Sequence, residues 1–281
     1  MPELPEVETV RRGLERHLST FEIEGVEVLR QRTIASPEHP DQFRAGLIGC
    51  RIGSWSRRGK YLMASLSRDG QPAGHWGVHL RMTGQFLWLE EPRSLCRHTR
   101  VRCWSRQGQE LRFIDVRSFA QMWWIPPGLE CSTVMTGLKK LGPEPFSTAF
   151  SSAYLHQKLA GSVRSIKAAL LDQALVAGVG NIYADESLFS AGVAPQRQGG
   201  SLSLEELERL RRSLLQVLEI SIGSGGTTFS DFRDLTGTNG NYGGVAWVYR
   251  RSGQPCRQCG QPIQRARLAG RSSHWCPTCQ R

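Results

Sequence analysis

Four cysteines near the C-terminus constrain the fold of this chain more than any other feature of its sequence. Cys256, Cys259, Cys276 and Cys279 form a C-x2-C-x16-C-x2-C pattern. Four thiolates complete the tetrahedral shell of Zn²⁺ and leave no position open for a substrate, so a site of this kind is structural. The alternative is a pair of redox-active C-x-x-C units, but both pairs lie in one short hairpin-like segment. The spacing therefore predicts one structural Zn²⁺ in a ribbon.

The charge of the chain indicates a partner with negative charge. The net charge is +11, and 31 of the 36 basic residues are arginines, because only five are lysines. Arginine binds phosphate through two parallel hydrogen bonds and stacks on bases, although a genome that prefers arginine codons would give the same bias. From Leu235 to Arg281 the chain has seven arginines and no Asp or Glu. This asymmetry predicts binding to nucleic acid.

The sequence has no feature typical of a membrane or secreted protein. Its apolar runs are shorter than the roughly 18 residues of a spanning helix. Glu3, Glu6 and Glu8 occupy the region where a secretory signal has basic residues and then an apolar stretch. We therefore expect a cytoplasmic protein, in which the four cysteines outside the motif are buried thiols.

The spacing of apolar residues divides the chain into a β-rich first half and a helical second half. Apolar residues recur at three- and four-residue steps over 2–17, which predicts a helix. Short strand-like segments between 26 and 125 predict a β-sandwich or barrel headed by that helix. Helical patterns follow over 166–171, 181–190 and 203–222.

The fold class that these elements predict is α+β and multidomain. We expect a helix and β-sandwich domain over 1–130, an interdomain connection over 131–151, a helical domain over 152–236, and a loop with the zinc ribbon over 237–281. Asn181 is the predicted N-cap of its helix. The glycine turn just before it gathers backbone N–H groups at a helix start, which suits an anion such as phosphate.

The whole chain resembles the formamidopyrimidine-DNA glycosylase family, beginning with Met1-Pro-Glu-Leu-Pro-Glu-Val-Glu-Thr9. The further segments that match in order are Arg58-Gly-Lys-Tyr61, His79 to Gly84, Asp115 to Phe119, Leu141 to Pro145, Asp172 to Tyr183, Gly225-Gly-Thr-Thr228 and the cysteine motif. The resemblance implies a β-sandwich, a helix-two-turn-helix domain and a zinc ribbon. It also implies a monomeric, nucleoid-associated enzyme that removes oxidised purines from double-stranded DNA and then cleaves the strand by β,δ-elimination.

The resemblance also implies four catalytic residues. Pro2 is the nucleophile once Met1 is removed, because its secondary amine gives an iminium that cannot lose an N–H proton and so acts as an electron sink. Glu3 is the implied general acid at the sugar ring oxygen. Lys60 is implied in base release and β-elimination, and Arg271 in δ-elimination and the target phosphate. Taken from the sequence alone, Glu3 and Glu6 are more simply helix caps, and Lys60 is more simply a solvated hairpin lysine.

A second set of residues is implied in DNA binding. An enzyme that extrudes its target base must fill the gap, and the residues that match the gap-filling positions are Met82, Arg117 and Phe119. The residues that match phosphate-contacting positions are His98, Lys167, Asn181 and Tyr242. Gly237 to Gly244 matches a loop that covers the extruded base. Without the resemblance, Met82 and Phe119 are more simply core residues on strands, and Asn239-Gly240 a hairpin turn.

The chain departs from the family pattern at a few positions near these residues. The segment Asp115-Val-Arg-Ser-Phe-Ala120 stands where the family often has Asp-Pro-Arg-Arg-Phe-Gly. The chain therefore lacks the proline and the glycine that shape the backbone in the family pattern, and it lacks a second arginine beside Arg117. Arg81 replaces a frequent glycine before Met82, and Gly243 a common phenylalanine.

Two other functions are compatible with part of this sequence. The sister enzyme endonuclease VIII shares Pro2, Glu3 and zinc but prefers oxidised pyrimidines; Leu4, the gap-filling set and the glycine-rich loop favour the purine enzyme. A non-catalytic DNA-binding protein on the same scaffold would keep the basic ribbon, but it would not need Pro2 after a removable Met1.

Overall fold

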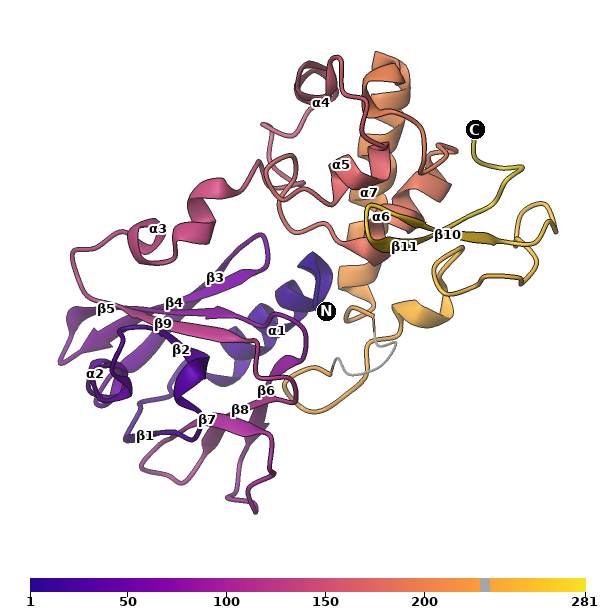
Figure 1. Cartoon of the computed structure of the whole chain (residues 1–281). Coiled ribbons are helices and arrows are strands. Elements are labelled where there is room, and N and C mark those ends of the chain that lie inside the picture. The colour runs from indigo at the N-terminus through magenta and orange to yellow at the C-terminus, as the bar shows by residue number, and fades with distance from the viewer. Residues whose placement is uncertain (228–232) are drawn as a thin grey trace. The chain divides into compact units, whose positions relative to one another are not determined.

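The computed structural model describes residues 1–227 and 233–281, and these residues form two compact units (Figure 1). The first unit contains residues 1–139 and 225–241, and the second contains residues 140–224 and 242–281. The boundaries predicted from the sequence divide the chain more finely and stay predictions; the predicted segment 152–236 includes 228–232, which lie outside the described residues. Within the described ranges, no helix has the length and apolarity needed to cross a bilayer.

The first unit begins with helix α1, Leu4–His17, as the periodicity predicts. Its buried face consists of Leu4, Val7, Val10 and Leu14, spaced at helical intervals. The start of the helix is fixed by the Glu6 carboxylate, which accepts the backbone N–H of Glu3 at 2.8 Å and so satisfies one of the donors that a helix start leaves open.

Two sheets pack against α1 and form the predicted sandwich. One sheet has the strand order β2-β9-β5-β4-β3 and the other β1-β7-β8-β6. The strands are β1 (Gly25–Val28), β2 (Ile34–Ser36), β3 (Arg51–Arg58), β4 (Tyr61–Arg68), β5 (Gln71–His79), β6 (Gly84–Leu89), β7 (Thr99–Trp104), β8 (Glu110–Asp115) and β9 (Gln121–Ile125). All pairings are antiparallel except that of β2 with β9.

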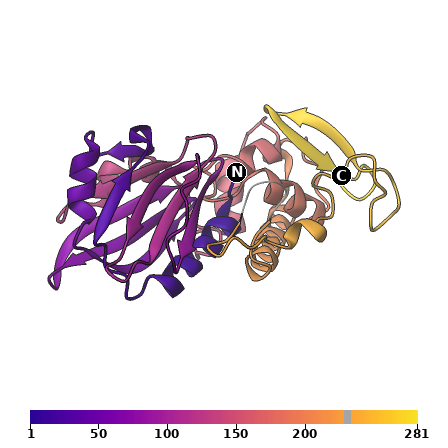
Figure 2. The same ribbon diagram turned by 90° about the horizontal axis from the view of Figure 1, so that it is seen from below.

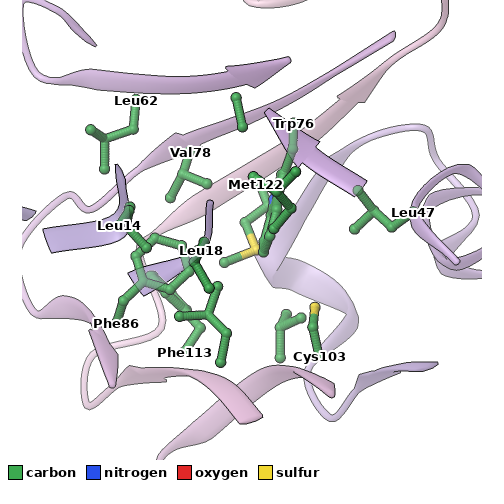
Figure 3. Close-up of a cluster of buried hydrophobic side chains, with 14 of the residues drawn as sticks. Leu14, Leu18, Leu47, Leu62, Trp76, Val78, Phe86, Cys103, Phe113 and Met122 are labelled. Carbon is green, nitrogen blue, oxygen red and sulfur yellow. The ribbon is translucent and has the colours of Figure 1, made fainter. Parts of the chain in front are cut away.

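The core of this unit lies between the two sheets and α1. Strand β4 alternates strictly between buried and partly buried residues, as a strand with one face inward does. Figure 3 shows Leu14 and Leu18 of the helical segment among side chains from both sheets, including Trp76, Phe86 and Phe113. Figure 2 shows the strands of the unit from below.

The same unit holds short helical segments that the apolar pattern did not predict. They are the 3-10 turn η1 (Gln31–Thr33), helix α2 (Pro40–Leu47) and helix α3 (Cys131–Val134), while the 3-10 segment η2 (Thr136–Lys140) leads to the second unit. Within the strand-like region, residues 78–89 are likewise not one strand: they form the end of β5 and all of β6, separated by residues 80–83. Of the four cysteines outside the motif, which were expected to be buried, the structure buries Cys50 and Cys103, but Cys131 is only partly buried and Cys96 is exposed.

The second unit is helical and ends in a β-hairpin. Its helices are α4 (Ser152–Leu159), α5 (Ile166–Leu170), α6 (Asn181–Ser190) and α7 (Leu204–Gly223), with 3-10 turns η3 (Gly199–Ser201) and η4 (Tyr242–Gly244). Serine side chains cap three of the helices, since Ser151, Ser165 and Ser203 each accept a backbone N–H of the first turn. The antiparallel hairpin of β10 (Gln264–Leu268) and β11 (Arg271–Trp275) lies beside α6 (Figures 1 and 2).

One helix start differs from the sequence prediction. The N-cap of α6 is Gly180, in an extended conformation with φ −136°, and Asn181 is the first helical residue. The prediction that Asn181 is the N-cap was therefore wrong by one position. The side chain of Asn181 instead donates to the carbonyl oxygen of Ser272 on β11, at 3.0 Å.

The packing of α2 gives a testable prediction about stability. A Cβ at Gly46 would lie 2.3 Å from Cδ2 of Trp124, whereas a Cβ at Gly223, in the last turn of α7, would meet nothing within 4 Å. We expect Gly46→Ala to lower the free energy of unfolding by about 1–3 kcal/mol, because the ring must move. Gly223→Ala should leave it unchanged or raise it by up to about 1 kcal/mol. Urea unfolding followed by tryptophan fluorescence measures both, and equal effects would contradict this account.

Candidate functional site

The chain end is buried and fixed in the first unit. Pro2 is buried, and Glu3 and Glu6 are 3% and 1% exposed. One carboxylate oxygen of Glu6 accepts the N–H of Glu3, and the other accepts the N–H of Thr227, each at 2.8 Å. Glu6 therefore fastens the start of the chain to a segment 221 residues away. Sequence reasoning treated Glu6 only as a possible cap, because nothing in its position indicates the second contact.

Two glycines make this fastening possible. Gly226, just before Thr227, has φ +81°, and a Cβ there would lie 3.2 Å from the Glu6 side chain. A Cβ at Gly240 would lie 2.4 Å from the carbonyl oxygen of Gly226. Only glycine fits both positions without movement of the backbone. The matched segment Gly225-Gly-Thr-Thr228 is described up to Thr227, and Thr228 lies outside the described residues.

Contacts along α1 show which part of the sheet the chain end faces. Glu15 accepts the N–H of Trp55 at 3.1 Å. Two helical turns earlier, Glu8 accepts a hydrogen bond from Nε of Arg57, also at 3.1 Å. The helix therefore runs antiparallel to β3, and its first residues extend toward the end of that strand. That end is the Gly59-Lys60 turn, which joins β3 to β4. Lys60 is only 7% exposed, so it is not a solvated hairpin lysine.

His79 is a further residue at this end of the sheet, and it was missed as a candidate from the sequence. It pairs with Tyr61 on β4 and with Gln121 on β9, and its ring lies 4.5 Å from that of Tyr61. Burial, and then the positive charges of Arg81 and Lys60, lower the pKa of His79 to about 3. The ring is therefore neutral at physiological pH, and its Nδ1 accepts the N–H of Arg81 at 2.9 Å.

The predicted gap-filling residues lie on two turns organised by Asp115. This buried carboxylate accepts the N–H of Arg117 at 3.2 Å and that of Ala120 at 2.8 Å, and it also binds the hydroxyl of Thr83, which follows Met82. Phe119 is 42% exposed, and the guanidinium carbon of Arg117 lies 4.8 Å from its ring centre. The simpler interpretation of Phe119 as a core residue is therefore wrong. Met82 is partly buried.

His98 lies on the same surface of the first unit. Its Nε2 accepts a hydrogen bond from Nε of Arg97 at 3.0 Å, and its carbonyl oxygen accepts the N–H of Asp115 at 2.9 Å. Arg100 donates to the carbonyl oxygen of Asp115 at 2.8 Å. The structure thus brings the predicted residues His98, Arg117 and Phe119 together around one buried acid.

The second unit gives Lys167 a different environment from the predicted one. Lys167 is fully buried; its Nζ lies 2.7 Å from a carboxylate oxygen of Asp185 and 2.6 Å from the carbonyl oxygen of Ser272. A direct phosphate contact does not agree with this burial, because the charge is already neutralised inside the protein. Lys167 and Asn181 instead both donate to the carbonyl oxygen of Ser272, and so they fix the residue that follows Arg271. Arg271 itself is exposed at the start of β11.

Tyr242 and the loop before it also differ from the simplest expectation. Tyr242 is 3% exposed and its ring lies 5.8 Å from that of Tyr183; burial raises the pKa of its hydroxyl. Just before the predicted loop, the Asp234 carboxylate accepts the N–H groups of Thr236 and Thr238. Among the described residues no pair of strands flanks Asn239-Gly240, so the alternative of a hairpin turn is wrong.

The four cysteines of the motif meet as the spacing predicts. Their sulfur atoms all lie within 4.8 Å of one another, with 3.9 Å between Cys256 and Cys279 and 3.4 Å between Cys259 and Cys276. Zinc–sulfur bonds of about 2.3 Å in a tetrahedron require about 3.8 Å between sulfurs. These residues therefore fit one structural zinc. Phe189 of α6 packs against the buried cysteines and fastens the ribbon to the helices.

Comparisons with known proteins agree with this arrangement. Three family models match in order: the formamidopyrimidine-DNA glycosylase N-terminal domain over residues 1–122, the formamidopyrimidine-DNA glycosylase H2TH domain over 141–233, and a zinc finger found in FPG and IleRS over 253–281. The sequence is 66% identical to the formamidopyrimidine-DNA glycosylase of Parasynechococcus marenigrum and 62% identical to that of Prochlorococcus marinus strain MIT 9313. Both matches cover the whole of each chain.

Solved structures of similar fold come from Lactococcus lactis. A complex of its Fpg with DNA that contains an abasic site has a TM-score of 0.89 and 34% identity, and covers 99% of each chain. A complex of a mutant of that protein with DNA that contains Fapy-dG has a TM-score of 0.90 and 33% identity, and covers all of both chains. The wild-type protein has also been solved with DNA that contains an oxidised pyrimidine, at a TM-score of 0.89 and 33% identity over both whole chains.

The zinc ligands give a testable prediction. Cys276→Ser should lose the zinc and leave the ribbon unfolded, because metal binding is part of folding in such a site. Cys131→Ser, a change to a cysteine outside the cluster, should keep one zinc per chain. Metal analysis and limited proteolysis over 253–281 measure both. A Cys276→Ser variant with full zinc content and an intact ribbon would contradict the assignment.

The buried His79 predicts a pH dependence of stability. The pKa of His79 is about 3 in the folded protein and about 6.5 in the unfolded chain. Below about pH 6.5, protonation of His79 therefore stabilises the unfolded chain but not the folded protein. Stability is therefore lost as the pH falls from 6.5 toward 3. His79→Asn keeps an acceptor for Arg81 but does not titrate. Between pH 7 and pH 5 the unmodified protein should lose about 2 kcal/mol more unfolding free energy than this variant; parallel curves would refute the buried, neutral histidine.

Proposed function

The chain belongs to the formamidopyrimidine-DNA glycosylase family, and from that premise we propose that it excises oxidised purines from duplex DNA through an iminium on Pro2 and then cleaves the strand by β,δ-elimination. Members of the family are bifunctional DNA glycosylases and AP lyases, so this chain is an enzyme and not a non-catalytic binding protein. Its relatives are named after formamidopyrimidines, which are ring-opened forms of oxidised purines. This name disfavours the endonuclease VIII alternative. Its structure is that of a zinc-finger protein with one structural zinc.

The observation that carries the mechanism is the buried chain end. Termini usually fray, yet Pro2 and Glu3 are buried, held by Glu6, and directed toward the turn that contains Lys60. Removal of Met1 makes the Pro2 nitrogen a free secondary amine, and this amine is the proposed nucleophile.

The proposed base excision uses Pro2 and Glu3 in sequence. The Pro2 nitrogen forms a bond to the anomeric carbon as the bond from that carbon to the base breaks. The base leaves with the electron pair and takes up the proton that the Pro2 amine loses. Glu3 donates a proton to the ring oxygen as the sugar opens, so that the iminium between nitrogen and carbon is complete. The iminium nitrogen carries no proton, and its positive charge makes the neighbouring sugar protons easier to remove.

Lys60 and Arg271 act in the later steps of this proposal. Lys60 assists release of the base and the β-elimination that expels one phosphate. A neutral His79 suits this role, because it adds no positive charge beside the lysine. Arg271 binds the phosphate of the target nucleotide and assists the δ-elimination. Its position on β11 depends on Lys167 and Asn181, which bind the neighbouring carbonyl.

The proposed DNA-binding residues complete the function. Met82 and Phe119 fill the gap left by the extruded base, and Arg117 contacts the base that has lost its partner. His98 and Asn181 contact phosphates, and residues 237–244 cover the extruded base. Tyr242 was also matched to a phosphate contact, but it is 3% exposed and packs beside Tyr183, so its proposed role is to position that segment. The exposure of Phe119 and its contact with Arg117 support this assignment, because an aromatic ring at a protein surface next to a cation is suited to stacking on bases.

The nucleophile gives the decisive prediction. Protein without Met1 should form an adduct on a duplex with 8-oxoguanine opposite cytosine, trapped by borohydride and mapped to the nitrogen of Pro2. A chain that keeps Met1 has an amide at that nitrogen and should bind abasic DNA without base release or strand cleavage.

The control for the role of Glu3 is a preformed abasic site. Glu3→Gln should lose base excision more than cleavage of that site, because the open-chain aldehyde needs less help at the ring oxygen. A crosslink on Lys60, or normal turnover with Met1 attached, would overturn the assignment of Pro2.

A further inference from the structure

Phe119 contacts a second arginine that belongs to no predicted site. The guanidinium carbon of Arg32 lies 5.9 Å from the centre of the Phe119 ring, and that of Arg117 lies 4.8 Å from it. Arg32 is exposed and comes from the 3-10 turn η1, far from Phe119 in sequence. The turn leads into β2, which pairs with β9 directly after Phe119 (Figure 1).

Hydrogen bonds link the segments of the first unit that carry arginines near this ring. The N–H groups of Leu29 and Arg30, just before η1, donate to the carbonyl oxygen of Arg100. Arg100 in turn donates to the carbonyl oxygen of Asp115, which begins the turn to Phe119. Backbone hydrogen bonds therefore fix η1 beside the segment that carries His98. We call the exposed or partly exposed arginines here the arginine rim: Arg32, Arg81, Arg97, Arg100 and Arg117.

The rim has no acidic partner to balance it. Throughout residues 1–227 and 233–281, no ion pair joins a carboxylate to an arginine of the rim. Asp115 lies near these arginines, but it is fully buried. Its carboxylate oxygens accept hydrogen bonds from the backbone of the turn and from Thr83. Positive charges gathered without counter-charges repel one another and attract a polyanion.

We propose that Arg32 is a DNA-binding residue of this enzyme. With Arg117 it contacts and steadies the Phe119 ring, and its guanidinium binds a backbone phosphate beside the base step that the ring enters. Ser118, the residue between Arg117 and Phe119, has no charge, so η1 supplies the second cation at this ring. The inference rests on the proposed role of Phe119 as a gap-filling residue.

The test measures binding to a duplex with a stable abasic-site analogue, which separates affinity from chemistry. At about 0.1 M salt we expect Arg32→Ala to weaken binding about five- to tenfold, and the slope of log affinity against log salt to fall by about one, because one phosphate contact is lost. Arg32→Lys should restore the slope but not the whole affinity, since an ammonium stacks less well on a ring than a guanidinium does.

The matched control is Arg106→Ala, which removes the same charge from an arginine side chain that is 83% exposed and pairs with Glu24. It should leave affinity and salt slope unchanged. The thermal midpoints of all variants should agree within about 2 °C, because these arginines lie at the surface. An Arg32→Ala variant that behaves as Arg106→Ala would overturn the inference.

Phe119→Ala separates this inference from the proposed function. If Phe119→Ala weakens binding and Arg32→Ala does not, only the role of Arg32 fails. If neither Phe119→Ala nor Arg117→Ala changes binding or excision, the gap-filling proposal fails, and the role of Arg32 fails with it. In the double variant Arg32→Ala/Phe119→Ala, the change in log affinity should be smaller than the sum of the single changes, because the two side chains act together. A strictly additive result would contradict the steadying contact.

Discussion

The bridge made by the Glu6 carboxylate is the interaction on which the first unit's functional end depends. Its two oxygens bind the N–H groups of Glu3 and Thr227, and the side chain is 1% exposed. A buried charge is tolerated only when hydrogen bonds replace its water, and each bond to a charged group contributes about 1.5–3 kcal/mol. An N-terminal amine can serve as a nucleophile only if the chain end keeps one position. The backbone of residues 226 and 227 supplies that order.

In the second unit, two buried acids likewise fix the backbone of distant segments through hydrogen bonds. Asp185 and Glu186 are neighbours on α6, and both are buried. Asp185 binds Lys167 and also accepts the N–H of His274 on β11. Glu186 accepts three consecutive N–H groups, those of residues 247–249; burial raises its pKa, and these hydrogen bonds oppose the rise. The basic ribbon is thus docked on the helices by two adjacent carboxylates, and Arg271 remains exposed.

The sequence predicted the features that depend on local spacing and left open those that depend on distant partners. The zinc ligands and α1 follow from spacing alone. Lys167 was matched to a phosphate contact, because a lysine in a short helix gives no indication of a carboxylate on another helix. Helix α2 was missed, since it is only eight residues long in a strand-rich region. Phe119 appeared to be a core residue by type, yet the turn set by Asp115 directs it outward.

Two contacts hold residues 237–244, the loop proposed to cover the extruded base. In the first unit, Gly240 packs on Gly226, so close that a side chain would collide with its carbonyl. In the second unit, Arg257, which lies between two zinc-ligating cysteines, donates to the carbonyl oxygens of Gly244 and Val245 at 3.0 and 3.1 Å. The segment therefore follows a contact beside the buried chain end and precedes a contact of the zinc site. Loss of zinc would release Arg257 and with it residues 244 and 245, so the metal would support the proposed covering loop as well as the fold of the ribbon.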